Sequence, residues 1–237
     1  MGGIALSVLA WGYLIMLGGH GAAAAPAIDA RPFHPSAAFL FAFLMWSVMM
    51  VAMMLPSAIP TVLLFETIAR KQVDDSGRPP STVLFIAGYL IIWTVYSGFA
   101  AIGQLWLQHA GLIATAMAKS APTVSAIIPI VAGLFQFTPL KSTCLKHCQS
   151  PMGFFMLHWR KGQKGALLMG LRSGMYCVGC CWALMVLMFV AGGMNMLWMA
   201  GLALFVLIEK LAPGGRRFSR LSGLLMIAWG IWIGTRI

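Results

Sequence analysis

The sequence predicts an all-α protein with a single domain over residues 1–237, built as a polytopic bundle of about seven transmembrane helices. Composition and segment length both support this fold class. The chain has 237 residues, of which 60% are hydrophobic and only 9% are charged, and soluble domains are much more polar than this. Its apolar segments are long, and a backbone inside a bilayer must satisfy its own hydrogen bonds, which a helix does.

The first apolar segment, residues 4–17, is short for a transmembrane helix. The alanine-rich stretch at 22–27 could be the cleavage site of a signal peptide. A signal peptide normally begins with basic residues, and none precedes this segment. We therefore favour a retained helix, and cleavage would leave six spans.

Six further segments are apolar enough to be spans. Pro56 and Pro60 are expected to kink or locally unwind the second span of the chain, and Pro129 is expected to interrupt the fourth. In the fifth, Gly170 and Gly174 lie four residues apart, which lets two helices approach closely in a bilayer. The six segments cover approximately residues 37–65, 82–107, 122–140, 166–190, 196–208 and 221–233.

The basic residues predict the orientation of the bundle. Twelve of the 16 Lys and Arg residues follow the second, fourth and sixth segments, and two follow the first, third and fifth. Because cytoplasmic loops carry the excess of positive charge, the N-terminus is predicted to be cytoplasmic and the C-terminus to face outward. The same distribution explains the net charge of +11 without a nucleic-acid partner.

The acidic residues exclude several functions. The chain has only five, all in predicted loops or at predicted helix ends: Asp29, Glu66, Asp74, Asp75 and Glu209. Proton relays need buried carboxylates, and hard cations such as Mg²⁺ need oxygen ligands. The chain also has no Walker-type phosphate loop and no paired acid and base. Whether it is an enzyme stays open, and non-catalytic metal handling is favoured.

Sulfur residues are the candidate ligands, because thiolates and thioethers select soft metals. In the fifth segment Cys177, Cys180 and Cys181 share one helix face, which Met185 and Met188 continue. Four methionines of the second segment lie at a similar predicted depth, and a third group is predicted at the cytoplasmic end of the fourth. The four methionines are Met49, Met50, Met53 and Met54, and the third group consists of Cys144, His147 and Cys148.

A monovalent soft ion suits these residues best, because thioether ligands add no charge that must be buried. Cu(I) is the expected ligand, and Zn²⁺ is an alternative where thiolates meet an imidazole. The methionines alone would also be explained by packing. Arg172, near the start of the fifth segment, either extends to the membrane surface or activates a nearby thiol.

Several of these motifs together resemble an uncharacterised bacterial family described as predicted metal-binding integral membrane proteins. The resemblance implies metal binding in the inner membrane of a bacterium, and it supplies no substrate or reaction. Its matching segments are residues 45–57, Gln136–Lys141 with Cys144, Leu145, Cys148 and Pro151, residues 174–185, Gly193–Asn195 with Trp198 and Met199, and Glu209–Lys210.

The leading hypothesis is an integral membrane protein that binds Cu(I) through its Cys and Met residues and acts in metal transport, delivery or metalloenzyme assembly. Its expected partners are the lipid bilayer and a metallochaperone or membrane complex. One alternative is a membrane thiol–disulfide redox protein, and another is a structural subunit of a larger membrane metalloenzyme. The sequence leaves open whether the Cys144/Cys148 pair and the three cysteines of the fifth segment form one site.

Overall fold

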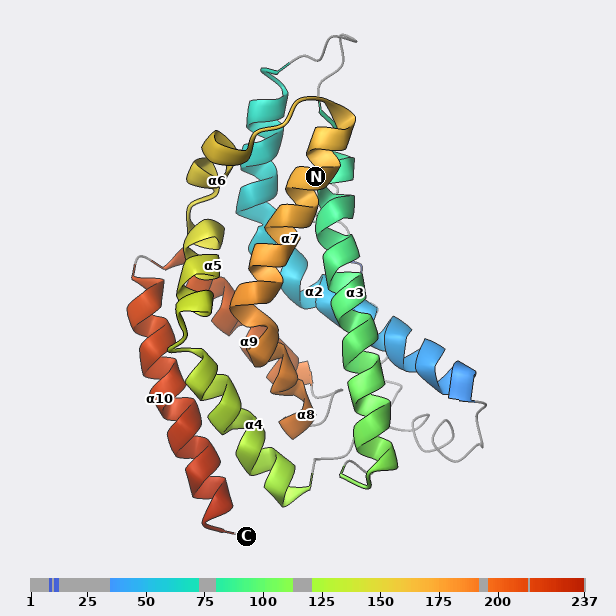
Figure 1. The fold of residues 1–237 in the computed structure, drawn as a ribbon, viewed down its shortest axis with the longest axis vertical. Coiled ribbons are helices and arrows are strands. Elements are labelled where there is room, and N and C mark those ends of the chain that lie inside the picture. The colour runs from blue at the N-terminus through green and yellow to red at the C-terminus, as the bar shows by residue number, and fades with distance from the viewer. Residues whose placement is uncertain are drawn as a thin grey trace.

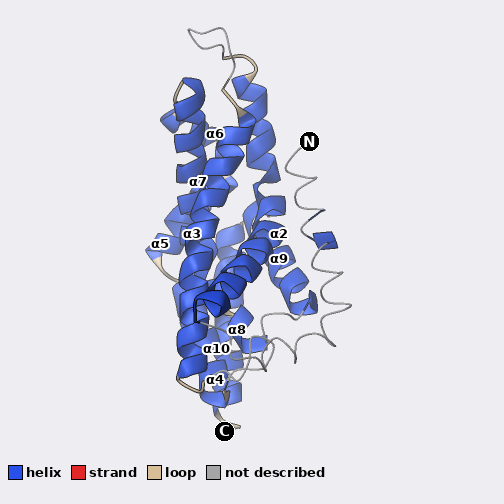
Figure 2. Cartoon of the chain, turned by 90° about the vertical axis from the view of Figure 1, so that its right-hand side faces the viewer, coloured by secondary structure: helices blue, strands red, loops and turns tan. Residues whose placement is uncertain are grey.

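The structure, a computed structural model, describes residues 9, 11–12, 35–72, 80–112, 121–191, 196–212 and 214–236. All regular structure in these ranges is helical (Figures 1 and 2), which confirms the predicted all-α class for them. The helices are α2 (Pro35–Ala69), α3 (Thr82–His109), α4 (Pro122–Phe135), α5 (Pro139–Gln149), α6 (Pro151–His158), α7 (Gly162–Val186), α8 (Met188–Ala191), α9 (Met196–Leu211) and α10 (Gly215–Gly234).

Among the described residues, three helices are long and apolar enough to cross a membrane: α2, α3, and α7 continued to Val190. A fourth span is formed if α4 and α5, which meet at a bend of 67°, count as one. The prediction of seven spans is therefore supported only in part. Helix α9 has 16 residues, fewer than a transmembrane helix usually needs, and the first turn of α10 contains arginines. Most of the first segment lies outside the described residues, and the orientation stays a prediction.

The interruption expected at Pro129 is wrong. Helix α4 runs unbroken through Pro129, and the chain instead bends between Phe135 and Pro139. Thr138 explains this position, because a residue before proline avoids the helical conformation. Its side chain also caps α5 by accepting a hydrogen bond of 3.3 Å from the backbone N–H of Lys141. The predicted fourth span is thus mainly α4, and the basic loop expected after it instead contains a second short helix, α5, which points in a different direction.

Helix α2 remains helical through Pro56 and Pro60, although its two ends run in different directions (Figure 1). Pro56 has no N–H to donate to the carbonyl of Ala52. That carbonyl instead accepts a hydrogen bond of 2.9 Å from the indole N–H of Trp11. The proline therefore bends the helix and creates an acceptor that a residue of the first apolar segment uses.

The Gly170/Gly174 seam packs against α3, as the spacing of the two glycines predicts. A methyl group at Gly170 would collide with the backbone carbonyl of Phe85, and one at Gly174 would lie 3.1 Å from the carbonyl oxygen of Tyr89. Gly88 makes the reciprocal approach, against the backbone of α7 at Leu167. The cysteine face of α7, which follows this seam, is therefore held inside the protein.

Gly170→Ala is expected to lower the free energy of unfolding by about 1–3 kcal/mol, because the added methyl group must push α3 and α7 apart. Gly103→Ala is the matched control in α3, since a Cβ there would meet nothing within 4 Å. Thermal unfolding of both variants in one detergent would measure the difference. Equal melting temperatures for the two would contradict the close approach.

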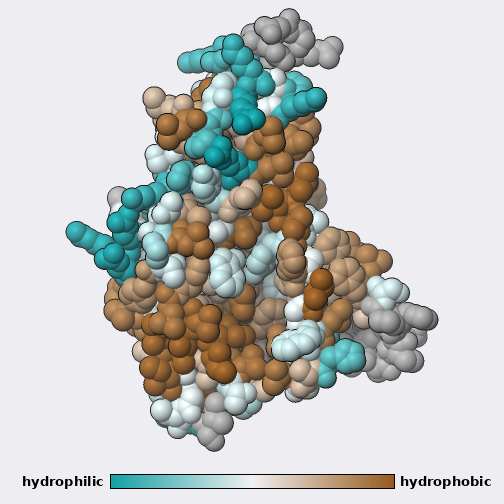
Figure 3. Space-filling model, in the orientation of Figure 1, coloured by the Kyte–Doolittle hydropathy of each residue, from teal (hydrophilic) through white to brown (hydrophobic). Residues whose placement is uncertain are grey.

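The outer surface is apolar over the bundle and basic at one end. Hydrophobic residues dominate the surface over α4 and α10, and hydrophilic residues gather beyond the end of α2, near the start of α7 and beside the start of α10 (Figure 3). A surface of this kind suits a protein embedded in lipid. On α3 the exposed apolar side chains recur at helical spacing: Val83, Ile91, Val95, Phe99, Ile102 and Trp106.

Candidate metal centre

The predicted sulfur ligands meet where α2, α5 and α7 pack together. Helix α7 carries Cys177, Cys180 and Cys181, which are 1%, 1% and 0% exposed. The methionines of α2 share one buried cluster with these thiols, and the equal membrane depth expected for the two groups stays a prediction. Of them, Met54 contacts a thiol directly, with its sulfur 3.9 Å from that of Cys181. Fully buried around this contact are Met49, Met50, Met53 and Met185.

Helix α5 adds its two thiols to the same cluster. The sulfur of Cys148 lies 3.8 Å from that of Cys180. One turn earlier, the sulfur of Cys144 faces the backbone of α7 and would lie 2.7 Å from a Cβ built at Gly179. The two cysteine groups, whose relation the sequence left open, are therefore parts of one cluster.

The sulfur spacing suits paired metal ligands. Metal–sulfur bonds of about 2.3 Å at a tetrahedral angle place two sulfur atoms roughly 3.8 Å apart. Both sulfur contacts, Cys148 with Cys180 and Cys181 with Met54, match this separation. The same distances suit hydrogen bonds from an S–H group, so the contacts fit the protonated thiols as well.

The thiols of α7 also bond to their own helix. Cys180 and Cys181 lie 3.1 and 2.8 Å from the carbonyl oxygen of Cys177, to which each donates a hydrogen bond. Within the described residues, no three His, Cys, Asp or Glu side chains converge as a ready-made metal site. An ion would be held by sulfur pairs that include methionine, and the thiols would release these bonds to reach it.

His147 lies at the edge of the cluster. Its ring stacks on Tyr176, with centroids 4.2 Å apart and planes at 4°, and its Nδ1 is 2.9 Å from the carbonyl oxygen of Thr143. It also lines a small cleft that leads to Cys148 and Cys177. His147 is therefore placed where a metal ion would enter or leave, and none of these contacts joins it to a thiol.

A buried lysine contacts the thiols. Lys210, on α9, is 7% exposed, and its ammonium group donates to Ser57 at 2.8 Å and to the sulfur of Cys177 at 3.0 Å. The hydroxyl group of Tyr89, on α3, lies 3.0 Å from the same sulfur. Five helices thus contribute to the cluster, and a positive charge sits beside its thiols.

Comparison with known proteins indicates the family of the chain and the metal associated with that family. A family model described as PpoB2, copper chaperone, matches residues 43–233. The chain belongs to the PpoB2 copper chaperone family. No curated protein and no solved structure gives a significant match to it. The matched range contains every candidate ligand named above, from Met49 to Met185, and association with copper follows from membership of the family.

The cluster of this PpoB2 family chain fits copper, because its donors are thiols and thioethers rather than carboxylates. The carboxylate of Glu209 is not a free ligand, because it already forms an ion pair with Lys141. Both of its oxygen atoms lie 2.8 Å from the ammonium group of Lys141, one of them in a hydrogen bond. Each partner of this ion pair is 1% exposed. The copper ion would be cargo held by sulfur.

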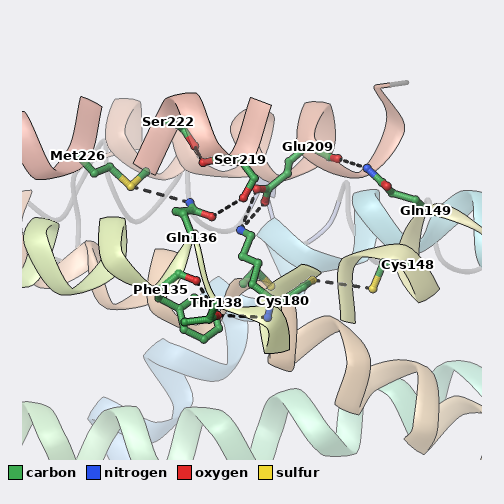
Figure 4. A network of polar contacts seen from close by, with 12 residues as sticks. Phe135, Gln136, Thr138, Cys148, Gln149, Cys180, Glu209, Ser219, Ser222 and Met226 are labelled. Carbon is green, nitrogen blue, oxygen red and sulfur yellow. Dashed lines mark hydrogen bonds and ion pairs between the residues drawn. The ribbon is translucent and has the colours of Figure 1, made fainter. Parts of the chain in front are cut away.

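Glu209 lies at a helix end, as expected, but its carboxylate is buried, which the sequence did not indicate. It lies near the end of α9, but α5 and α10 cover it. Its backbone carbonyl accepts a bond of 2.9 Å from Gln149, and beside it Ser219 donates to Gln136 at 2.8 Å (Figure 4). A polar layer therefore joins α5 to α9 through Lys141 and Gln149, and joins the segment before α5 to α10 through Gln136.

Sequence reasoning in this PpoB2 family chain missed Lys210, the basic residue that contacts a thiol. Arg172 is exposed, which agrees with the interpretation that it extends to the surface. Lys210 and Lys141 had been counted among the loop charges, and both are buried. The adjacent Glu209–Lys210 pair at the end of an apolar segment is the one sequence signal that could have indicated them, since charged residues inside membrane proteins are usually functional.

Proposed function

We propose that this protein is an integral membrane copper chaperone that binds Cu(I) on its buried sulfur cluster and passes it to a metalloprotein. The observation that carries the proposal is the pairing of Cys148 with Cys180 across two helices, at 3.8 Å. A second pair, Cys181 and Met54, continues the cluster toward the methionines of α2. The donors are soft throughout, which disfavours hard cations, and the neutral thioethers favour Cu(I) over Zn²⁺ because they add no charge that would balance a divalent ion.

The cleft beside His147 supplies a route for the ion. It holds about 20 Å³ of free volume, close to the roughly 10–15 Å³ that one water molecule needs. An ion that has exchanged its water for sulfur ligands would fit, and a hydrated ion would not. The residues that line it come from α2, α3, α5, α6, α7 and α9: Ser57, Ala58, Thr61, Tyr89, His147, Cys148, Phe154, Ser173, Tyr176, Cys177 and Lys210.

We infer that this route opens on the cytoplasmic side of a bacterial inner membrane, and the basic end of the bundle supports this orientation by the positive-inside rule. Exposed Arg70 and Lys71 follow α2, and exposed Arg160 and Lys161 precede α7. In this arrangement Cys148 and His147 exchange the ion with a soluble partner at the cytoplasmic side. The methionines of α2 and Met185 hold it deeper in the membrane.

Purification without oxygen is expected to retain copper in the wild-type protein. Metal analysis should find copper in molar proportion to the chain, with zinc in trace amounts. A variant with both Cys180→Ser and Cys181→Ser should lose the copper, because each proposed sulfur pair then loses a member. A wild-type protein that retains no copper after reconstitution with Cu(I) would contradict the proposal.

One observation favours a second candidate function, exchange of thiols and disulfides. Cys148 and Cys180 come from different helices and lie close together, so a small movement could join them, whereas the adjacent Cys180 and Cys181 are poorly placed to bond. Mass spectrometry after alkylation would distinguish the two functions. A redox protein should cycle between free and bonded thiols without metal, and a copper chaperone should protect its thiols only when copper is added.

A further inference from the structure

We propose that an open cavity at the turn from α6 into α7 binds an anionic phospholipid of the surrounding membrane, with the phosphate at two arginines and the acyl chains along α7. The proposal depends on the membrane location of the chain and not on copper. The cavity has a volume of about 330 Å³, within the range of roughly 300–1,000 Å³ that is usual for ligand pockets. Its lining has a polar part, His158, Arg160 and Arg172, and an apolar part that includes Leu168 and Met175.

The turn that carries Arg160 is held against α7. Gly162, the first residue of α7, has a φ of 75°, which residues with a side chain rarely adopt, and it gives the chain its sharp entry into the helix. A methyl group at Gly165 would collide with the backbone carbonyl of Arg160, so this glycine lets the turn lie on the start of α7. The ring of Trp159 packs against that of Phe65 on α2, with centroids 5.7 Å apart. The position of Arg160 is therefore fixed on both sides.

The two arginines of the cavity carry charges that no carboxylate of the described residues balances. The described ranges contain two acidic residues, and each has another partner. Glu66 pairs with Arg70 at 2.6 Å, and Glu209 pairs with Lys141 at 2.8 Å. A guanidinium group stays charged at physiological pH, and its parallel N–H donors match two oxygen atoms of a phosphate. The charge and the geometry of the lining therefore suit a phosphate group.

Arg172 stands on a face of α7 that is otherwise apolar. Leu168 lies one turn before it and Met175 one turn after it, and these two residues are 45% and 62% exposed. Residues at this spacing share one face of a helix, so the guanidinium group emerges from a surface that suits lipid tails. A charge on such a surface is costly unless it reaches the interface or meets an opposite charge. A phospholipid supplies a phosphate for the arginines and acyl chains for Leu168 and Met175.

His158 completes the polar part of the lining at the end of α6. Its Nδ1 is 3.2 Å from the carbonyl oxygen of Phe154, and the two rings stack with centroids 5.3 Å apart. These contacts orient the ring and leave Nε2 as the nitrogen that a headgroup can reach. A headgroup with hydroxyl groups offers a hydrogen-bond partner to this nitrogen. Phosphatidylglycerol, which has a phosphate and two hydroxyl groups, is therefore the appropriate probe.

Native mass spectrometry of the full-length protein in detergent would test the site with phosphatidylglycerol and phosphatidylcholine of the same acyl chains. Wild-type protein is expected to bind phosphatidylglycerol at least about tenfold more tightly, because each basic residue at a membrane surface strengthens the attraction of anionic lipid several-fold. The double variant Arg160→Gln and Arg172→Gln should reduce this preference to less than about threefold. Both side chains are exposed, so the fold should survive, and Arg172→Gln alone is the second variant if it does not.

The control variant Arg216→Gln with Arg217→Gln removes two exposed arginines at the start of α10, outside the cavity. It should keep the preference for phosphatidylglycerol. An equal loss in the control would overturn the site, because net charge alone would then explain the preference. Glycerol phosphate, which resembles the headgroup without its chains, should not displace the lipid at equal concentration. Displacement would overturn the lipid as the ligand in favour of a soluble phosphate compound.

Copper analysis of the same samples separates this inference from the proposed function. Wild-type protein that retains Cu(I) but binds the two lipids equally would overturn the lipid site alone. Wild-type protein that prefers phosphatidylglycerol but binds no Cu(I) would overturn the chaperone function alone. The variant of Arg160 and Arg172 should retain as much Cu(I) as the wild type, because these arginines line a different cavity from the cleft that leads to Cys148.

Discussion

Cys148→Ser is expected to lower the affinity for Cu(I) by more than about 100-fold, a larger loss than changes around a metal's ligands usually cause. Serine replaces a soft sulfur donor by a hard oxygen of similar size, so the fold should survive while the site is lost. The effect is large because Cys148 is the thiol through which α5 contacts Cys180 of α7, at 3.8 Å. Without it, α5 no longer supplies a thiol to the pair with Cys180.

Cys144→Ser is the matched control. It makes the same chemical change one turn earlier in the same helix, at a sulfur that packs against Gly179. We expect a loss of less than about tenfold for this variant, in the range of indirect effects. Titration of both proteins against a chelator of known Cu(I) affinity would measure the two values. Equal losses would mean that α5 donates through both thiols and that the pair with Cys180 is not the principal contact.

The helices and the cysteine face of α7 could be predicted from the sequence, because both depend on local patterns. The apolar segment expected at 82–107 is α3 (Thr82–His109). The spacing of Cys177, Cys180 and Cys181 places them on one face in any helix. The Gly170/Gly174 seam indicated that this face would meet another helix, and α3 occupies that position.

The contact between the sulfur atoms of Cys148 and Cys180 could not be predicted, because it depends on the bend of 67° between α4 and α5. A straight span through residues 122–149 would have carried Cys148 away from α7. The sequence analysis expected the interruption at Pro129 and not at Thr138–Pro139, and a local pattern does not indicate the direction that the chain takes after a bend. That direction is determined by tertiary contacts, among them the bond from Gln149 to the carbonyl of Glu209.

The buried charges were missed for a related reason. Lys141 and Glu209 are 68 residues apart in the chain, and each lies near a helix end, where charged residues are usually exposed. Only the packing of α5 against α9 brings them together. A rule that counts Lys and Arg in loops cannot separate Lys141 from Lys146, which is exposed on the same helix.

Breaking the Lys141–Glu209 ion pair is expected to destabilise the protein strongly. Lys141→Met or Glu209→Gln alone should lower the free energy of unfolding by about 3–5 kcal/mol, because each leaves the opposite charge buried without a partner. The pair is 1% exposed on both sides, so water cannot compensate. Thermal unfolding in detergent would measure the loss. Glu66→Gln, in the surface pair with Arg70, should leave the melting temperature unchanged.

The double variant Lys141→Met and Glu209→Met distinguishes a charge effect from a loss of packing. It removes both charges and keeps two long apolar side chains, so most of the stability lost in each single variant should return. Copper binding should then return with it, because the ion pair holds α5 in place and contributes no ligand. A double variant that recovers stability but still binds no Cu(I) would instead mean that the charges of Lys141 and Glu209 act on the metal directly.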